Sequence, residues 1–149
     1  MSIFVTKRFY FLLIVSAYFT CFLITPSYSQ CPFARNWSVY IYSAMPDPVD
    51  VNVKSGDDDL GHHNITFDLG YRFNFCESIF GNTLFVGYFS HKFGSAHMHV
   101  FDRKVGALIG CKFGGHANVY WLLKQDGYYL SKEYKPYNDP TWELRGRWE

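Results

Sequence analysis

The strongest constraint on the fold is an alternation of side chains that recurs in short runs between turn-forming residues. In residues 37–42, Trp37, Val39 and Ile41 alternate with more polar neighbours, and residues 71–76 repeat this pattern. A period of two places successive side chains on opposite faces of a β-strand, so both runs predict strands with one buried face. Similar patterns predict further strands at residues 50–54, 63–68, 83–90, 96–102, 117–124 and 128–131.

Residues that favour turns separate these runs at short intervals, as at Pro46–Asp47–Pro48, Gly81–Asn82 and Asp126–Gly127. No amphipathic helical pattern persists for three turns. A content of 21% aromatic and 18% charged residues excludes a disordered or coiled-coil chain. We therefore predict an all-β fold, an antiparallel β-sandwich of about seven short strands with an irregular C-terminal tail. In that tail, Trp142 and Trp148 are expected to fold back onto the sandwich.

The first 29 residues have the layout of a secretory signal peptide. Lys7 and Arg8 precede the uncharged run 9–25, and small residues at Ser27 and Ser29 suit cleavage before Gln30. Seventeen residues of helix reach about 26 Å, short of a hydrocarbon core of about 30 Å, which makes a permanent membrane anchor the weaker alternative. We predict that residues 1–29 are removed and that residues 30–149 form one secreted, extracellular domain.

Secretion would have two consequences. The sequons at Asn36 and Asn64 would become acceptors for N-linked glycans. Loss of the leader would leave 12 basic and 13 acidic side chains, a formal charge of −1. Because no broad basic surface exists to neutralise phosphates, nucleic acid is not an expected partner.

Possible reaction chemistry centres on two histidines. His97 and His99 project from the same face of a predicted strand and could supply two metal ligands. A catalytic zinc needs a third ligand, and no H-E-x-x-H, C-x-x-C or G-x-S-x-G motif is present. We therefore predict no catalytic site, no metal and no cofactor. A secreted hydrolase or metal-dependent enzyme that uses His97, His99 and an acid such as Asp102 is the alternative function.

An acidic block between two glycines is interpreted as a turn. It resembles part of a calcium loop but lacks the alternating oxygen ligands and the final glutamate. Aspartates in such a segment bond to turn amides, and the glycines permit a tight reversal. The block consists of Ser55, Gly56, Asp57, Asp58, Asp59, Leu60 and Gly61.

Several blocks together resemble the plant self-incompatibility S-protein homologue family. These blocks are VNVKSGDDDLGHH at 51–63, FNFC at 73–76, GNTLF at 81–85, VFD at 100–102, Cys111, YWLLKQDGYY at 120–129 and Trp142. The resemblance covers roughly residues 37–148. It implies a small secreted plant β-sandwich of about seven strands that acts as a recognition or signalling ligand for a cell-surface receptor. We expect a monomer with no stable membrane anchor once the leader is removed.

The same resemblance implies a disulfide. Relatives usually carry cysteine at the positions of Val53 and Gly87. If those two cysteines pair with each other, their joint loss leaves Cys76 and Cys111 as the second bridge and Cys31 as the odd thiol. No residue is assigned to partner binding, although the loops at 90–95 and 104–115 are favoured because loops vary without disturbing the core.

Overall fold

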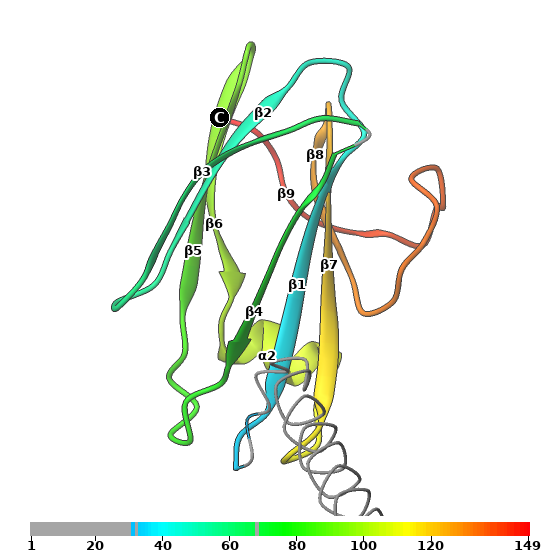
Figure 1. The fold of residues 1–149 in the computed structure, drawn as a ribbon. Coiled ribbons are helices and arrows are strands. Elements are labelled where there is room, and N and C mark those ends of the chain that lie inside the picture. Colours follow the sequence, from blue (N-terminus) through cyan, green and yellow to red (C-terminus); the bar gives the residue numbers. More distant parts are fainter. Residues whose placement is uncertain (1–30, 32, 68) are drawn as a thin grey trace, which may run out of the picture. The chain divides into compact units, whose positions relative to one another are not determined.

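Two β-sheets packed face to face make up the part of the chain that the structure describes (Figure 1). The structure is a computed structural model that describes residues 31, 33–67 and 69–149. The proposed signal peptide, residues 1–29, lies outside the described residues. The elements in chain order are β1 (Asn36–Ser43), β2 (Val49–Lys54), β3 (Asp59–Ile65), β4 (Tyr71–Cys76), β5 (Phe85–His91), β6 (Gly94–Phe101), α2 (Arg103–Ile109), β7 (His116–Lys124), β8 (Gly127–Ser131) and β9 (Glu143–Gly146).

The strands form sheet A, in the order β4-β1-β7-β8-β9, and sheet B, in the order β3-β2-β5-β6. All neighbours are antiparallel except β1 and β7, which run parallel. Parallel strands need a long crossover, and here β4, the four strands of sheet B and α2 all lie between β1 and β7 in the chain. The prediction of an all-β sandwich is confirmed, with nine described strands instead of about seven.

Each of the eight predicted strand segments is a strand, with ends that differ by at most four residues. Two elements were not predicted. The short helix α2 begins after Asp102, whose carboxylate accepts a hydrogen bond from the Val105 amide at 2.8 Å. Strand β9 lies within the tail that was expected to be irregular. No helix among the described residues is long and apolar enough to cross a membrane.

The core lies between the sheets and is built from the alternate residues identified in the sequence. Trp37, Val39 and Ile41 on β1 are almost completely buried. They pack in one apolar cluster with residues from both sheets, such as Val51 on β2. The Trp121 indole donates to the Val100 carbonyl at 2.9 Å, which ties sheet A to sheet B. The rigid core therefore fixes where the loops and outer faces lie.

The C-terminal tail folds back onto the sandwich, as predicted from its tryptophans. Trp142 is buried, and its indole donates to the Pro136 carbonyl at 2.9 Å. Trp148 packs against the core cluster and donates to the Lys124 carbonyl at 2.7 Å. Glu149 then exchanges two backbone hydrogen bonds with Ser95 on β6. The tail thus links the end of β7 in sheet A to sheet B.

The acidic block forms the β2–β3 turn. The Ser55 hydroxyl accepts hydrogen bonds from the amides of Asp57 and Asp58. Asp59 opens β3 and accepts from the Gly61 amide at 2.9 Å, where Gly61 has φ 78°, a conformation that favours glycine. The Lys54 ammonium and the Gly61 amide lower the pKa of Asp59 to about 2. These contacts give the block a local structural role.

Candidate recognition surfaces

The histidines that suggested enzyme chemistry lie on the exposed face of β6. His99 Nδ1 lies 2.9 Å from Asp102 Oδ2, while the other oxygen of Asp102 caps α2. Within residues 31–149, as far as they are described, no group of three or more His, Cys, Asp or Glu side chains could hold a metal ion. His99 and Asp102 therefore have a structural interaction at the start of the helix.

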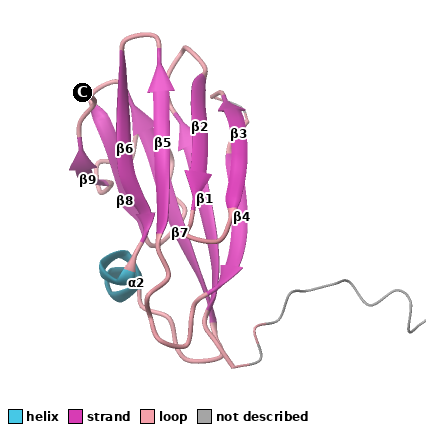
Figure 2. Cartoon of the chain, turned by 90° about the vertical axis from the view of Figure 1, so that its left-hand side faces the viewer, coloured by secondary structure: helices cyan, strands magenta, loops and turns pink. Residues whose placement is uncertain are grey.

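Three segments meet at one end of the sandwich, which we call the loop end: residues 31 and 33–35, residues 77–84 and residues 110–115. The Glu77 amide donates to the Arg35 carbonyl, and the Asn36 amide donates to the Gly115 carbonyl, both at 2.9 Å. Both views of the chain place these segments together below the strands (Figures 1 and 2). Hydrogen bonds at their bases therefore hold the three segments side by side.

A disulfide between Cys31 and Cys76 also joins the loop end, with Cα atoms 5.7 Å apart. The predicted Cys76–Cys111 bridge is therefore wrong. Antiparallel pairing places Asn36 at the start of β1 opposite Cys76 at the end of β4, and the preceding turn brings Cys31 back to the same point. Cys111 is a free thiol whose Sγ donates to the Lys112 carbonyl, and burial raises its pKa.

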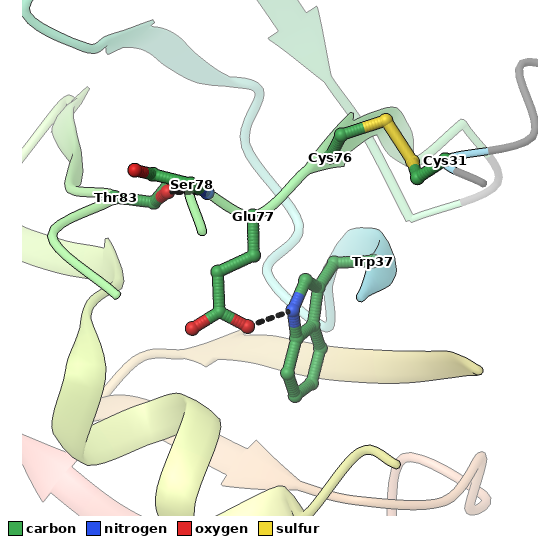
Figure 3. Close-up of a disulfide and its surroundings, with 6 residues drawn as sticks. All are labelled: Cys31, Trp37, Cys76, Glu77, Ser78 and Thr83. Atoms are coloured by element: carbon green, nitrogen blue, oxygen red, sulfur yellow. Dashed lines mark hydrogen bonds between the residues drawn. A yellow bond between two sulfur atoms is a disulfide. The ribbon is translucent and has the colours of Figure 1, made fainter. Parts of the chain in front are cut away.

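A buried carboxylate orders this end of the molecule. Glu77 directly follows the disulfide, and its Oε2 accepts a hydrogen bond from the Trp37 indole at 2.9 Å (Figure 3). The Arg35 guanidinium lies 3.4 Å from the same carboxylate. Glu77 is only 8% exposed, so these partners supply the bonds that water would otherwise make.

The rest of the β4–β5 loop is held by short-range hydrogen bonds. The Ser78 amide donates to the Thr83 hydroxyl at 2.7 Å, and the Gly81 amide donates to the Ser78 carbonyl at 2.8 Å. This backbone turns Ile79 and Phe80 outward, with 75% and 90% of their surfaces exposed. The loop end thus presents apolar side chains on an ordered frame.

A second surface is the outer face of sheet B, toward which Figure 2 looks. Most of the side chains on this face are polar, in contrast to the inner face. The register places them in three rows across the strands: Asn64–Asp50–Ser90–Ser95, His62–Asn52–Tyr88–His97 and Asp59–Lys54–Val86–His99. We call this surface the polar face.

An open groove of about 390 Å³ crosses the polar face. His62 Nδ1 lies 3.0 Å from Asp50 Oδ2 on its rim. Tyr88 is half exposed and stacks beside His97, with ring centroids 6.3 Å apart. The groove therefore offers charged, amide and aromatic groups together, a combination suited to specific polar recognition.

Sequence reasoning found only part of these surfaces. The favoured segment 90–95 is the β5–β6 hairpin, and Ser90 and Ser95 line the groove. The first half of the favoured segment 104–115 belongs to α2, and the second half is the loop before β7. Tyr88 and Glu77 were missed, although outward positions of a predicted strand could have indicated Tyr88. No pattern in the sequence distinguishes Glu77 as a buried residue.

The two positions at which the family resemblance implied cysteines in relatives face each other. Val53 on β2 and Gly87 on β5 are direct partners in the ladder. A Cβ atom at Gly87 would overlap the Phe89 ring and would lie 2.5 Å from Val100 Cγ2. Apolar packing therefore occupies the space on the inner side of this pair.

These features define a small β-sandwich with one disulfide, an ordered apolar loop end and a polar sheet face. The chain belongs to the plant self-incompatibility protein S1 family, which it matches over residues 38–148. This result confirms the family identified from the sequence blocks and supports an S-protein-like role in plants.

Three relatives from Arabidopsis thaliana are similar to the chain. S-protein homolog 1 and S-protein homolog 74 are each 30% identical over 101 residues, which cover 66% of this chain and 65% of each relative. S-protein homolog 7 is 34% identical over 107 residues, 71% of both chains. The match thus spans slightly less than two thirds of the first two relatives. No solved structure matches this chain significantly.

Proposed function

We propose that residues 30–149 are a secreted recognition ligand that binds a cell-surface protein, and that the chain is not a catalyst. Cleavage after Ser29 would release the domain, and the disulfide suits an oxidising extracellular compartment. Family membership supports the same role. N-terminal sequencing of protein secreted into the medium tests the first step: Gln30 is the expected first residue.

The polar face is the proposed contact with that protein. The observation that carries this assignment is the row His62–Asn52–Tyr88–His97, because it combines a half-exposed aromatic ring with hydrogen-bonding groups on a rigid sheet. Tyrosine provides a large contact area at a low cost in conformational entropy. Since the strands fix these side chains, little ordering is required on binding.

Binding of labelled protein to intact plant protoplasts tests this contact. We expect saturable binding that is lost when the cells are first treated with protease. Tyr88→Ala combined with His97→Ala should weaken it about tenfold or more, the effect of a central contact. Tyr134→Ala is the matched control, because Tyr134 is 63% exposed and contacts Tyr42 and Tyr120 of sheet A. Equal losses for both variants would reject the polar face.

Asn64 is the proposed glycan site. It is exposed on β3, an edge strand of sheet B, whereas Asn36 is half-buried on β1 between β4 and β7. A glycan at Asn64 would project beside Asp50 at one border of the polar face. Glycopeptide mapping of secreted protein should find a glycan on Asn64 and none on Asn36, and Asn64→Gln should abolish the mass shift that glycosidase produces.

A further inference from the structure

We propose that the loop end docks onto the surface of a lipid bilayer that carries anionic headgroups. This inference goes beyond the proposed function, since it involves another surface and does not require the receptor contact. The loop end carries Phe33, Ile79, Phe80 and Phe113, with exposed fractions of 69% to 90%. Large exposed apolar groups of this kind mark sites that contact proteins or membranes.

The arrangement of these side chains favours a bilayer over a protein. They come from all three segments of the loop end. Phe33, Phe80 and Phe113 make no contact with another aromatic ring among the described residues. A protein partner would need a separate pocket for each side chain, whereas a deformable bilayer interface accepts several separate apolar wedges at once.

Charge at this end suits an anionic surface. Lys112 lies beside Phe113, and Arg103 and Lys104 occupy the first turn of the adjacent helix α2. All three are exposed and form no ion pair within the described parts of the chain. Basic side chains beside inserted apolar groups strengthen binding to anionic lipid.

Beside α2, Glu143 lines a groove together with Lys132 and Lys135, which offset its charge. The other acidic groups nearby also leave this balance in place. The Glu77 carboxylate is buried against Trp37 and Arg35. Asp102 faces His99 and the α2 amides. Asp57 and Asp58 are exposed, and they border a groove between the β2–β3 turn and the β4–β5 loop on the sheet B side. Ile79 and Phe80 do not line this groove, so the bilayer contact we propose extends from these two side chains toward α2 and the loop 110–115.

The internal bonds of the loop end reduce the cost of docking. The Cys31–Cys76 disulfide and the Glu77–Trp37 hydrogen bond hold the bases of two segments. Little backbone freedom is then lost when Ile79 and Phe80 enter the interface. Ordered loops that carry outward apolar side chains are thus ready for insertion in the free protein.

Co-sedimentation with lipid vesicles tests the proposal without any receptor. Protein purified from the medium of expressing cells, with its N-terminus sequenced, is mixed with vesicles of phosphatidylcholine alone or with about 30% phosphatidylserine, the anionic lipid whose charge attracts basic groups. We expect binding to the mixed vesicles that falls as salt screens the charges. Ile79→Ser with Phe80→Ser should lower the partition coefficient about tenfold or more, because two apolar side chains leave the interface.

Two further variants test where the apolar contact lies and how much a basic side chain contributes to vesicle binding. Phe93→Ser is the matched control, because Phe93 is 77% exposed on the β5–β6 hairpin at the opposite end of the sandwich. It should leave vesicle binding within about twofold of the parent, the size of effect expected for a residue outside the contact. Lys112→Gln should reduce binding to the mixed vesicles and leave binding to phosphatidylcholine unchanged.

Three results would overturn the proposal: no binding of the parent protein to mixed vesicles, equal binding by the Ile79→Ser/Phe80→Ser variant, or an equal loss with Phe93→Ser. Circular dichroism and the melting temperature of each variant show that it is folded. Since the vesicles contain no protein, a failure here is distinct from a failure of the protoplast experiment.

Discussion

At the scale of single residues, one buried carboxylate holds the loop end in place. Replacing Glu77 with alanine leaves the Trp37 indole without its acceptor and Arg35 without its partner. We expect a loss of about 2 kcal/mol in the free energy of unfolding, the cost of a buried donor left unpaired. Glu77→Gln keeps an acceptor oxygen and should lose about 1 kcal/mol.

Urea unfolding of the variants measures this effect. Glu143→Ala is the control, because Glu143 is exposed and lies 4.0 Å from Arg145 as its ion-pair partner. It should change the free energy of unfolding by less than about 0.5 kcal/mol. A similar, small change for Glu77→Ala would contradict a structural role for the buried carboxylate.

Gly87 provides a second prediction at this scale. Its missing Cβ leaves the space that the Phe89 ring and Val100 occupy, so Gly87→Ala should destabilise the fold by about 1 to 3 kcal/mol through overpacking. Gly56→Ala is the matched control, since nothing lies within 4 Å of a Cβ there. Thermal unfolding should therefore show a lower melting temperature for Gly87→Ala than for Gly56→Ala.

At the scale of elements, Asp102 couples β6 to α2. Burial alone would raise the pKa of Asp102, but hydrogen bonds from the Val105 amide and His99 outweigh it and lower the pKa. The pKa of an aspartate in the unfolded chain is about 4, so the ionised carboxylate stabilises the fold above this pH. This contribution disappears as the pH falls through the lower pKa of the folded state. Asp102→Ala should cost about 1 kcal/mol at pH 7, the usual value of an N-cap.

Urea unfolding at pH 7 and at pH 3 checks the sign of this effect. The difference in the free energy of unfolding between the parent and Asp102→Ala should be smaller at pH 3 than at pH 7. Asp102→Asn keeps a capping oxygen, so its free energy of unfolding at pH 7 should lie between those of the parent and Asp102→Ala. A difference that grows toward pH 3 would show that the ionised form is not the stabilising one.

The elements also show where the sequence was sufficient and where it was not. Period-two alternation identified the strands because each buries one face, as Trp37, Val39 and Ile41 do on β1. Alternation says nothing about which strands pair, so the parallel β1–β7 contact was not predictable. Strand β9 owes its form to pairing with β8, and its residues Glu143–Gly146 carry no apolar alternation of their own.

The candidate surfaces were harder to predict for a related reason. The three segments of the loop end meet because β1 and β7 begin, and β4 ends, at the same end of sheet A. Without strand pairing, the sequence cannot place Cys31 beside Cys76. The family resemblance suggested Cys111 as the disulfide partner of Cys76 by elimination. The register of β1 with β4 instead brings Cys31 to Cys76.

At the scale of the whole molecule, the disulfide ties the N-terminal segment to the sandwich over a separation of 45 residues. Closing a loop of this size in the unfolded chain stabilises the folded state by about 4 kcal/mol in the loop-entropy account. Cys31→Ser should therefore lower the free energy of unfolding by about 2 to 4 kcal/mol. Cys111→Ser removes a half-buried thiol that bonds only to the Lys112 carbonyl, and we expect a loss below about 1 kcal/mol.

Non-reducing peptide mapping, followed by urea unfolding, distinguishes the two pairings. The parent protein and Cys111→Ser should both yield a peptide that joins Cys31 to Cys76. Cys31→Ser should yield no such peptide, because it removes one of the two sulfur atoms of the bridge. A Cys76–Cys111 peptide from the folded parent would instead restore the pairing inferred from the family, and the stability losses of the two serine variants would then be reversed.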